Sequence, residues 1–208
     1  MQARLTDLTL RDFSDRLSAA DPTPGGGSAA AYAGAMGAAL AGMVGRIAMK
    51  REPRDAVVDI VEEADSLRAH FIQLVQDDSA AFDRVTAALA LPKRTTDEKS
   101  ARKEALQAAL LAASRVPLDA AKAGRRLLAL CERLLEHATS AAVSDAGVAA
   151  LLAETAIRGA ALNVMINLAS LADATHVKAL SEELDRAVDG AEALRAAVVE
   201  RVEAKIAR

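Results

Sequence analysis

Apolar residues recur at spacings of three and four along almost the whole of this chain of 208 residues. Such spacing is typical of amphipathic α-helices, and the strict alternation typical of strands is absent over any useful length. Proline, glycine and short polar stretches interrupt the pattern. The segments between them predict helices over residues 6–20, 28–49, 97–113, 145–170 and 176–206, and a long helix between Pro53 and Leu91. Pro117 either kinks its helix or opens a new one over 116–137.

No internal repeat, linker or low-complexity tract divides the pattern. We therefore expect a single domain over residues 1–208, folded as an all-α, antiparallel bundle of long helices. Long helices with wide apolar faces in a chain of this size often bury one face in a partner subunit, so a homodimer is expected.

The segment from Ser28 to Gly45 contains no charged residue and is mostly alanine and glycine. Its small residues repeat every four positions, which places them on one helical face: Ala30, Gly34, Ala38 and Gly42. The segment has about the minimum length of a membrane span, but it has few bulky apolar residues and no flanking aromatic residues. The pattern favours a central helix of a soluble bundle over a membrane helix.

Composition supports the helical prediction and limits the possible functions. Apolar residues make up 52% of the chain but aromatic residues only 2%, so the core is built from alanine, leucine and valine. The net charge is −3 with both signs interspersed, which argues against nucleic-acid binding. One cysteine, Cys131, rules out an internal disulfide and favours a cytoplasmic location. The three histidines have no metal-ligand spacing, so no metal site is expected.

The run Pro22-Thr-Pro-Gly-Gly-Gly-Ser28 is the most distinctive motif. Two prolines stiffen the chain, and three glycines leave backbone amides bare and free to adopt positive φ. Ser28 is a suitable N-cap for the helix that follows. Such a turn either allows close packing or holds an anion at the positive end of the helix, and the pattern alone leaves both open.

Asp78 interrupts an apolar stripe, between Leu74 and Phe82, where leucine or alanine is expected. A carboxylate there is desolvated, which raises its pKa and makes it a candidate for proton transfer. The structural alternative is a core aspartate that an arginine or a helix terminus satisfies.

The helix that follows Ser144 carries a second set of polar residues. Asp145 suits the first helical turn, and Glu154 and Arg158 are spaced to form an ion pair. Asn163 and Asn167 lie in an apolar run and point to the same side as Asp145, opposite to the ion pair. Asp145 and Asn163 are about 27 Å apart along the axis, so a small ligand cannot contact both within one subunit; only a long ligand or a dimer-related pair of these residues brings both to one site. Buried amides at this spacing serve as helix–helix hydrogen bonds as often as ligand contacts.

Taken together, the motifs resemble the formimidoyltetrahydrofolate cyclodeaminase / methenyltetrahydrofolate cyclohydrolase family. The resemblance covers nearly the whole chain in order and rests on Pro22–Ala31, Asp78–Phe82, Leu91–Lys93, Val116–Leu118, Ser144–Ala149 and Arg158–Val164. It implies an all-helical, dimeric enzyme that acts on a tetrahydrofolate derivative and needs no metal or other cofactor.

The resemblance assigns roles to particular residues. Asp78 becomes the leading general acid/base and Asp145 the second catalytic residue. The residues expected to bind substrate are Pro24, Gly25, Gly26, Gly27, Ser28, Lys93, Ser144, Arg158 and Asn163. No formiminotransferase domain is attached, which favours the cyclohydrolase, opening 5,10-methenyl-tetrahydrofolate with water. The alternatives are the cyclodeaminase, which releases ammonia from 5-formimidoyl-tetrahydrofolate, and a non-catalytic helical dimer that binds folate or another acidic metabolite.

Overall fold

The computed structural model describes residues 4–51 and 55–207, and every regular element in these ranges is a helix. A 3₁₀ turn, η1 (Leu5–Asp7), and a short helix, α1 (Leu10–Ser18), precede four long helices. These are α2 (Gly26–Arg51), α3 (Asp55–Ala90), α4 (Thr96–Leu134) and α5 (Val143–Leu168). Two shorter helices, α6 (Ala174–Val188) and α7 (Ala191–Ile206), complete the described chain.

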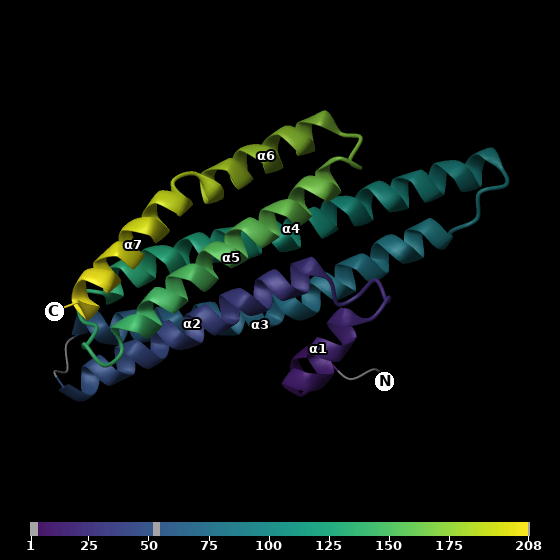
Figure 1. Ribbon diagram of the computed structural model, residues 1–208. Coiled ribbons are helices and arrows are strands. Elements are labelled where there is room, and N and C mark those ends of the chain that lie inside the picture. The colour runs from purple at the N-terminus through teal and green to yellow at the C-terminus, as the bar shows by residue number, and fades with distance from the viewer. Residues whose placement is uncertain (1–3, 52–54, 208) are drawn as a thin grey trace.

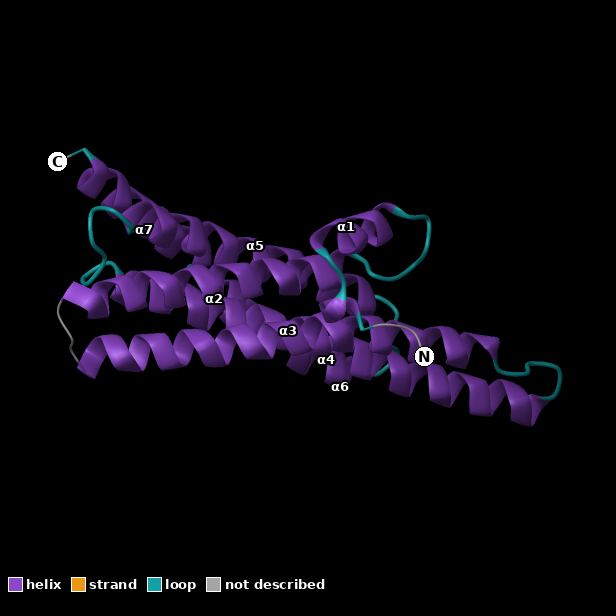
Figure 2. Cartoon of the chain, turned by 90° about the horizontal axis from the view of Figure 1, so that it is seen from below, coloured by secondary structure: helices purple, strands orange, loops and turns teal. Residues whose placement is uncertain are grey.

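The long helices form the predicted all-α antiparallel bundle (Figure 1). The hairpin of α3 and α4 projects beyond the other helices at one end (Figures 1 and 2). At the other side of the bundle, α6 and α7 pack on α4 and α5. The pair α6 and α7 therefore forms an outer layer on one side of the four long helices.

The Ala/Gly-rich helix α2 lies at the centre of the bundle, as predicted, and contacts α3, α4 and α5. All four small residues of its predicted stripe are buried. At Gly34 the helices are so close that an added Cβ would lie 2.4 Å from Cε1 of the Phe71 ring on α3. Since Phe71 is fully buried, glycine is what permits this approach.

Two described helices, α2 and α5, have the length and apolar composition of a membrane span. The apolar window of α2 is 67% buried in the bundle, whereas that of α5 is only 44% buried. The high burial of α2 agrees with a core helix. The lower burial of α5 leaves an exposed apolar surface.

Cys131 lies in the core and is completely buried on α4. Burial raises the pKa of its thiol to about 12. The thiol is therefore protonated at neutral pH and lacks the thiolate that reactive cysteines need.

Several predicted boundaries were wrong. Neither Ser28 nor Ser144 is an N-cap, because α2 begins two residues earlier and α5 one residue earlier. The segments 97–113 and 116–137 form one helix, α4, which continues through Pro117 and begins with a capping box of Thr95 and Glu98. The expected helix 176–206 is two helices, because Gly190 adopts a φ of 66° between them.

Candidate active site

A cleft of about 340 Å³ opens at the end of the bundle where α2 begins. Its walls come from the proline–glycine turn, α3, α4 and α5. The residues that line it are Pro22, Thr23, Gly25, Gly26, Gly27, Asp78, Ala81, Phe82, Val85, Ala113, Asn163, Ile166, Asn167 and Ser170. Hollows of about 400 and 470 Å³ elsewhere are larger, but none of the residues predicted to act on substrate lines them.

The cleft begins at Asp78 because α2 begins there. Along α3 the predicted apolar stripe is buried as far as Leu74. Beyond Asp78 there is no α2 to pack against, so Phe82 is 40% and Leu89 48% exposed. The apolar stripe of α3 therefore continues beyond the core at these two residues. Asp78 is the position at which the α3 stripe changes from core to cleft wall.

Asp78 is bound to the first turn of α2. The fully buried Ser28 donates its hydroxyl to Oδ2 of Asp78 at 2.8 Å, and the same hydroxyl lies 3.3 Å from the carbonyl of Val75. A Cβ added at Gly27 would lie 2.1 Å from Oδ1 of Asp78. Only glycine at position 27 therefore lets the carboxylate reach the helix N-terminus.

Burial raises the pKa of the Asp78 carboxyl above its ordinary value, and hydrogen bonds from the side chain and backbone N–H of Ser28 partly oppose this rise. The first amides of α2 have no carbonyl partner within the helix, so they stabilise negative charge at this end. Asp78 is thus a half-buried acid with a raised proton affinity at the edge of a cleft, as its position in the sequence predicted. Such a group is suited to take up and return a proton.

The glycine turn does not use the positive φ values that the sequence analysis allowed. Among the described residues only Gly190 has a positive φ. Gly25, Gly26 and Gly27 line the cleft with bare backbone, and the peptide bond between Thr23 and Pro24 is cis. The glycines of this motif therefore give close access to the backbone rather than an unusual backbone conformation.

Asn163 and Asn167 lie one turn apart on α5 and form the opposite wall. Asn163 donates from Nδ2 to the carbonyl of Gly159 at 2.8 Å. Asn167 donates from Nδ2 to the carbonyl of Ala113 on α4 at 3.0 Å. From its sequence position Asn163 is expected to bind substrate, and Asn167 is expected either in the site or at a helix contact. In the structure both residues line the cleft.

The apolar walls were not predicted. Phe82 lies one turn after Asp78 on α3, and Ile166 is 69% exposed between the two asparagines on α5. The sequence does show an apolar residue near each polar candidate on the same helix, and this pattern could have predicted the apolar walls. These side chains give the cleft a surface for a flat ring next to its polar groups.

Some predicted site residues do not line this cleft. Pro24 is buried in the turn behind the lining residues. Lys93 is exposed in the loop between α3 and α4. Ser144 and Asp145 lie in the first turn of α5, at the opposite end of that helix from Asn163. Within one chain, these last three residues are not brought to Asp78.

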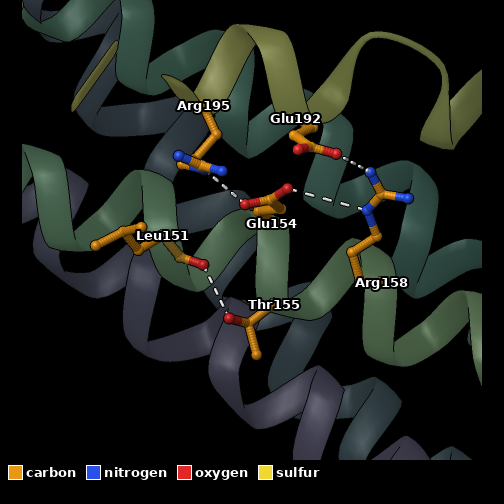
Figure 3. A network of polar contacts seen from close by, with 6 residues as sticks. All are labelled: Leu151, Glu154, Thr155, Arg158, Glu192 and Arg195. Carbon is orange, nitrogen blue, oxygen red and sulfur yellow. Dashed lines mark hydrogen bonds and ion pairs between the residues drawn. The ribbon is translucent and has the colours of Figure 1, made fainter. Parts of the chain in front are cut away.

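Arg158 faces α7 instead (Figure 3). Its guanidinium lies 3.1 Å from Glu192 and 3.9 Å from Glu154, and Arg195 of α7 donates to Glu154 at 2.7 Å. The ion pair and the two asparagines therefore lie on different sides of α5, as their spacing in the sequence predicts. A substrate-binding role for Arg158 stays a prediction.

Among the described residues, no group of three or more histidine, cysteine, aspartate and glutamate side chains is arranged to hold a metal ion. The functional groups that line the cleft are the Asp78 carboxyl, the amides of Asn163 and Asn167, the hydroxyls of Thr23 and Ser170 and the backbone of the glycine turn. The fully buried Ser28 acts on the cleft only through Asp78. This set can bind a polar ring and move a proton at its edge.

Comparison with known proteins identifies the class. The family model for formiminotransferase-cyclodeaminase matches residues 9–186, so the chain belongs to this family. The resemblance drawn from the sequence motifs is thereby confirmed.

Individual relatives are similar over most of the chain. A methenyltetrahydrofolate cyclohydrolase of Methylorubrum extorquens is 38% identical over 95% of this chain and 97% of its own length. A formimidoyltransferase-cyclodeaminase of Rattus norvegicus is 36% identical, but the chain covers only 32% of its length. The crystal structure of a formiminotetrahydrofolate cyclodeaminase from Thermotoga maritima superposes with a TM-score of 0.79 at 31% identity, covering 97% of this chain and 96% of that one.

Proposed function

We propose that this protein is a methenyltetrahydrofolate cyclohydrolase, which adds water to 5,10-methenyl-tetrahydrofolate and forms 10-formyl-tetrahydrofolate. The observation that carries the proposal is the half-buried Asp78, bound to Ser28 at the edge of a cleft. The match to the cyclohydrolase of Methylorubrum extorquens over 97% of that protein's length supports this reaction over related ones.

The proposed reaction needs one group that both accepts and donates a proton. Asp78, as the carboxylate, accepts a proton from water as the oxygen bonds to the methenyl carbon between N5 and N10. The resulting carbon is tetrahedral and carries a hydroxyl. Asp78 then returns its proton to N5, the bond from carbon to N5 breaks, and the hydroxyl proton leaves as the formyl carbonyl forms. The raised pKa of Asp78 suits both steps.

The other residues of the cleft bind and orient the substrate in this proposal. The amides of Gly26 and Gly27 stabilise negative charge on the attacking oxygen or on Asp78. The methenyl compound is a cation, so the Asp78 carboxylate also favours its binding. Phe82 and Ile166 cover the faces of the ring system. The proposed chemistry uses water and protein groups alone.

The second candidate is the cyclodeaminase reaction, which the likeness to the Thermotoga maritima cyclodeaminase favours. There N10 attacks the formimidoyl carbon on N5, and the Asp78 carboxylate takes the N10 proton. Asp78 then donates this proton to the exocyclic nitrogen, and the bond from carbon to that nitrogen breaks as ammonia leaves and the methenyl cation forms. Both reactions pass through a tetrahedral carbon between the same two nitrogens. One arrangement of Asp78 and the glycine turn therefore suits either.

An absorbance assay distinguishes the candidates, because methenyl-tetrahydrofolate absorbs in the near ultraviolet and 10-formyl-tetrahydrofolate does not. Loss of this absorbance faster than in buffer is the result expected for the cyclohydrolase. Its appearance from 5-formimidoyl-tetrahydrofolate, with release of ammonia, would instead identify the cyclodeaminase. Tight folate binding without either change would identify a binding protein, and the absence of folate binding would overturn the proposal.

We also propose that the protein is a homodimer formed through α5. A stripe on α5 is exposed and largely apolar although it belongs to a helix of the bundle: Ser144, Val148, Leu151, Thr155, Leu162 and Ile166. An isologous contact pairs this stripe with its own copy in antiparallel orientation. Such a contact buries apolar surface that the single chain leaves in water.

The symmetry of this contact gives Asp145 a role in catalysis. The stripe has its midpoint at Thr155, so position 145 of one subunit lies opposite position 165 of the other. Asp145 and Asn163 point to the same side of α5, next to the exposed stripe. The twofold axis places this side of both α5 helices on the same side of the interface. In this arrangement Asp145 of the partner subunit lies beside the cleft between Asn163 and Asn167.

Mixed dimers test this arrangement. Asp78→Asn and Asp145→Asn chains are coexpressed with different tags, and the heterodimer is purified. If each site uses Asp78 from one subunit and Asp145 from the other, the heterodimer has one intact site and about half of wild-type activity, although both homodimers are inactive. An inactive heterodimer would mean that both residues act within one subunit. An active Asp145→Asn homodimer would remove Asp145 from the mechanism.

A further inference from the structure

Pro117 lies in the interior of α4, although proline is unfavourable there. Proline has no N–H, so the carbonyl four residues earlier loses its helical hydrogen bond. In α4 that carbonyl belongs to Ala113, which is buried and lines the cleft. A buried carbonyl without a partner destabilises the fold, so the proline requires a donor from elsewhere.

Asn167 of α5 provides that donor. Its Nδ2 donates to the carbonyl of Ala113 at 3.0 Å. Because only the nitrogen of the amide can donate to a carbonyl, this bond fixes which way the planar amide group faces. The oxygen Oδ1 is left on the other side of the amide, and no hydrogen bond to it from any described residue is found.

Asn163 has the same arrangement one turn earlier. Its Nδ2 donates to the carbonyl of Gly159 at 2.8 Å, which leaves its Oδ1 as an acceptor. A Cβ built on Gly26 would lie 3.5 Å from Nδ2 and 3.9 Å from Oδ1 of Asn163, so this amide lies directly beside the glycine turn. Each asparagine therefore keeps its amide oxygen as an acceptor on α5, while the first turn of α2 carries backbone donors.

We infer that Asn167 determines specificity for the aminopyrimidinone ring of the folate, and that Pro117 positions Asn167 through the carbonyl of Ala113. The ring presents two adjacent donors, N3–H and the 2-amino group. Oδ1 of Asn163 and Oδ1 of Asn167 accept from them. This inference rests on the proposed function, since it assumes that a folate occupies the cleft.

The test compares the binding of 5-formyl-tetrahydrofolate with that of its analogue in which a methyl group replaces the 2-amino group. Calorimetry gives both dissociation constants. We expect the wild-type protein to prefer the amino compound by about tenfold, the range of one or two hydrogen bonds. Asn167→Leu loses most of this preference, because it removes the acceptor and the donor together.

Pro117→Ala changes no side chain of the cleft wall and restores the N–H that bonds to Ala113, so it folds at least as stably as the wild-type protein. The restored N–H shares the Ala113 carbonyl with Asn167 and weakens the bond from Nδ2, so the Asn167 amide is held less firmly. We expect KM to rise about three- to tenfold with a much smaller change in kcat, and the preference for the amino compound to fall. Ser114→Ala is the matched control, because it removes a donation to the Leu110 carbonyl in the same turn, and it leaves the preference unchanged.

If Asn167 only joins α5 to α4, Asn167→Leu lowers stability but keeps the wild-type preference, and the inference is overturned. An unchanged KM and preference in Pro117→Ala would overturn the role of the proline. A wild-type protein that binds neither compound would instead contradict the proposed function itself, so the two failures are distinguishable.

Discussion

Gly27 on α2 and Asp78 on α3 are in such close contact that a Cβ atom at position 27 would lie 2.1 Å from Oδ1 of Asp78. This distance is far below any real contact, so a side chain at position 27 displaces the carboxylate. The last glycine of the motif and the acid of the α3 stripe, 51 positions apart in the sequence, therefore form one unit.

Gly27→Ala is expected to lower kcat/KM by at least tenfold, because the added methyl group moves Asp78 away from Ser28. The overpacking also lowers the free energy of unfolding by about 1–3 kcal/mol. Steady-state kinetics and chemical denaturation measure both effects. Gly26→Ala is the matched variant: its Cβ would meet Nδ2 of Asn163 at an ordinary 3.5 Å, and we expect a clearly smaller loss. Equal losses in the two variants would show that the contact with Asp78 is unimportant.

Asp78→Asn is expected to lower turnover by about 10²- to 10⁴-fold while the protein stays folded.

The effect of Asp78→Asn on the free energy of unfolding follows from the raised pKa of Asp78 in the wild-type protein. Since the native state holds the proton more tightly than the unfolded state, ionisation of Asp78 destabilises the fold as pH rises from about 3.8 to the native pKa. Asparagine does not ionise, so the variant does not lose stability over this pH range. We therefore expect the variant to be at least as stable as the wild-type protein at pH 7, with an advantage that shrinks as pH is lowered through that window.

Urea denaturation at several pH values between 4 and 7 measures this difference. A variant that is much less stable than the wild-type protein at pH 7 would mean that the charged carboxylate stabilises the native state. The raised pKa would then be wrong. Unchanged turnover in a folded Asp78→Asn protein would remove Asp78 as the acid/base.

The helical fold and the desolvated position of Asp78 were predictable because both depend on local spacing. Composition and periodicity predicted the all-α bundle, and one polar residue in an apolar stripe predicted a carboxyl with a raised pKa. The role of Asp78 as acid/base stays a prediction. The break at Gly190 was missed, because the apolar spacing continues across it and only the backbone angle reveals it. The role of Pro117 was missed for a different reason: the sequence shows which carbonyl loses its partner but not that Asn167, fifty residues later, replaces it.

The close contact of α2 with α3 gives a stability prediction that is independent of the cleft. Gly34→Ala brings a Cβ to 2.4 Å from the fully buried ring of Phe71, which has no space to move. We expect a loss of about 1–3 kcal/mol in the free energy of unfolding. The smaller side chain of Phe71→Leu relieves the clash, so the double variant Gly34→Ala/Phe71→Leu should lose less than the sum of the single variants. Additive losses would contradict a direct contact between the two positions.

The exposed stripe of α5 provides the last prediction. Leu162 is 68% exposed within one chain, yet it lies on a helix whose stripe we propose to be the dimer interface. Leu162→Glu introduces two like charges into a twofold contact, so it is expected to shift the protein toward monomers in light scattering coupled to size-exclusion chromatography. Leu10→Glu is the matched control, since Leu10 is 74% exposed on α1, away from that stripe, and the variant should keep the wild-type mass. If the α5 contact also carries Asp145 to the partner's cleft, the monomeric variant loses turnover although Asp78, Ser28 and the glycine turn are unchanged. A fully active monomer would contradict a shared site, and an unchanged mass would contradict the α5 interface.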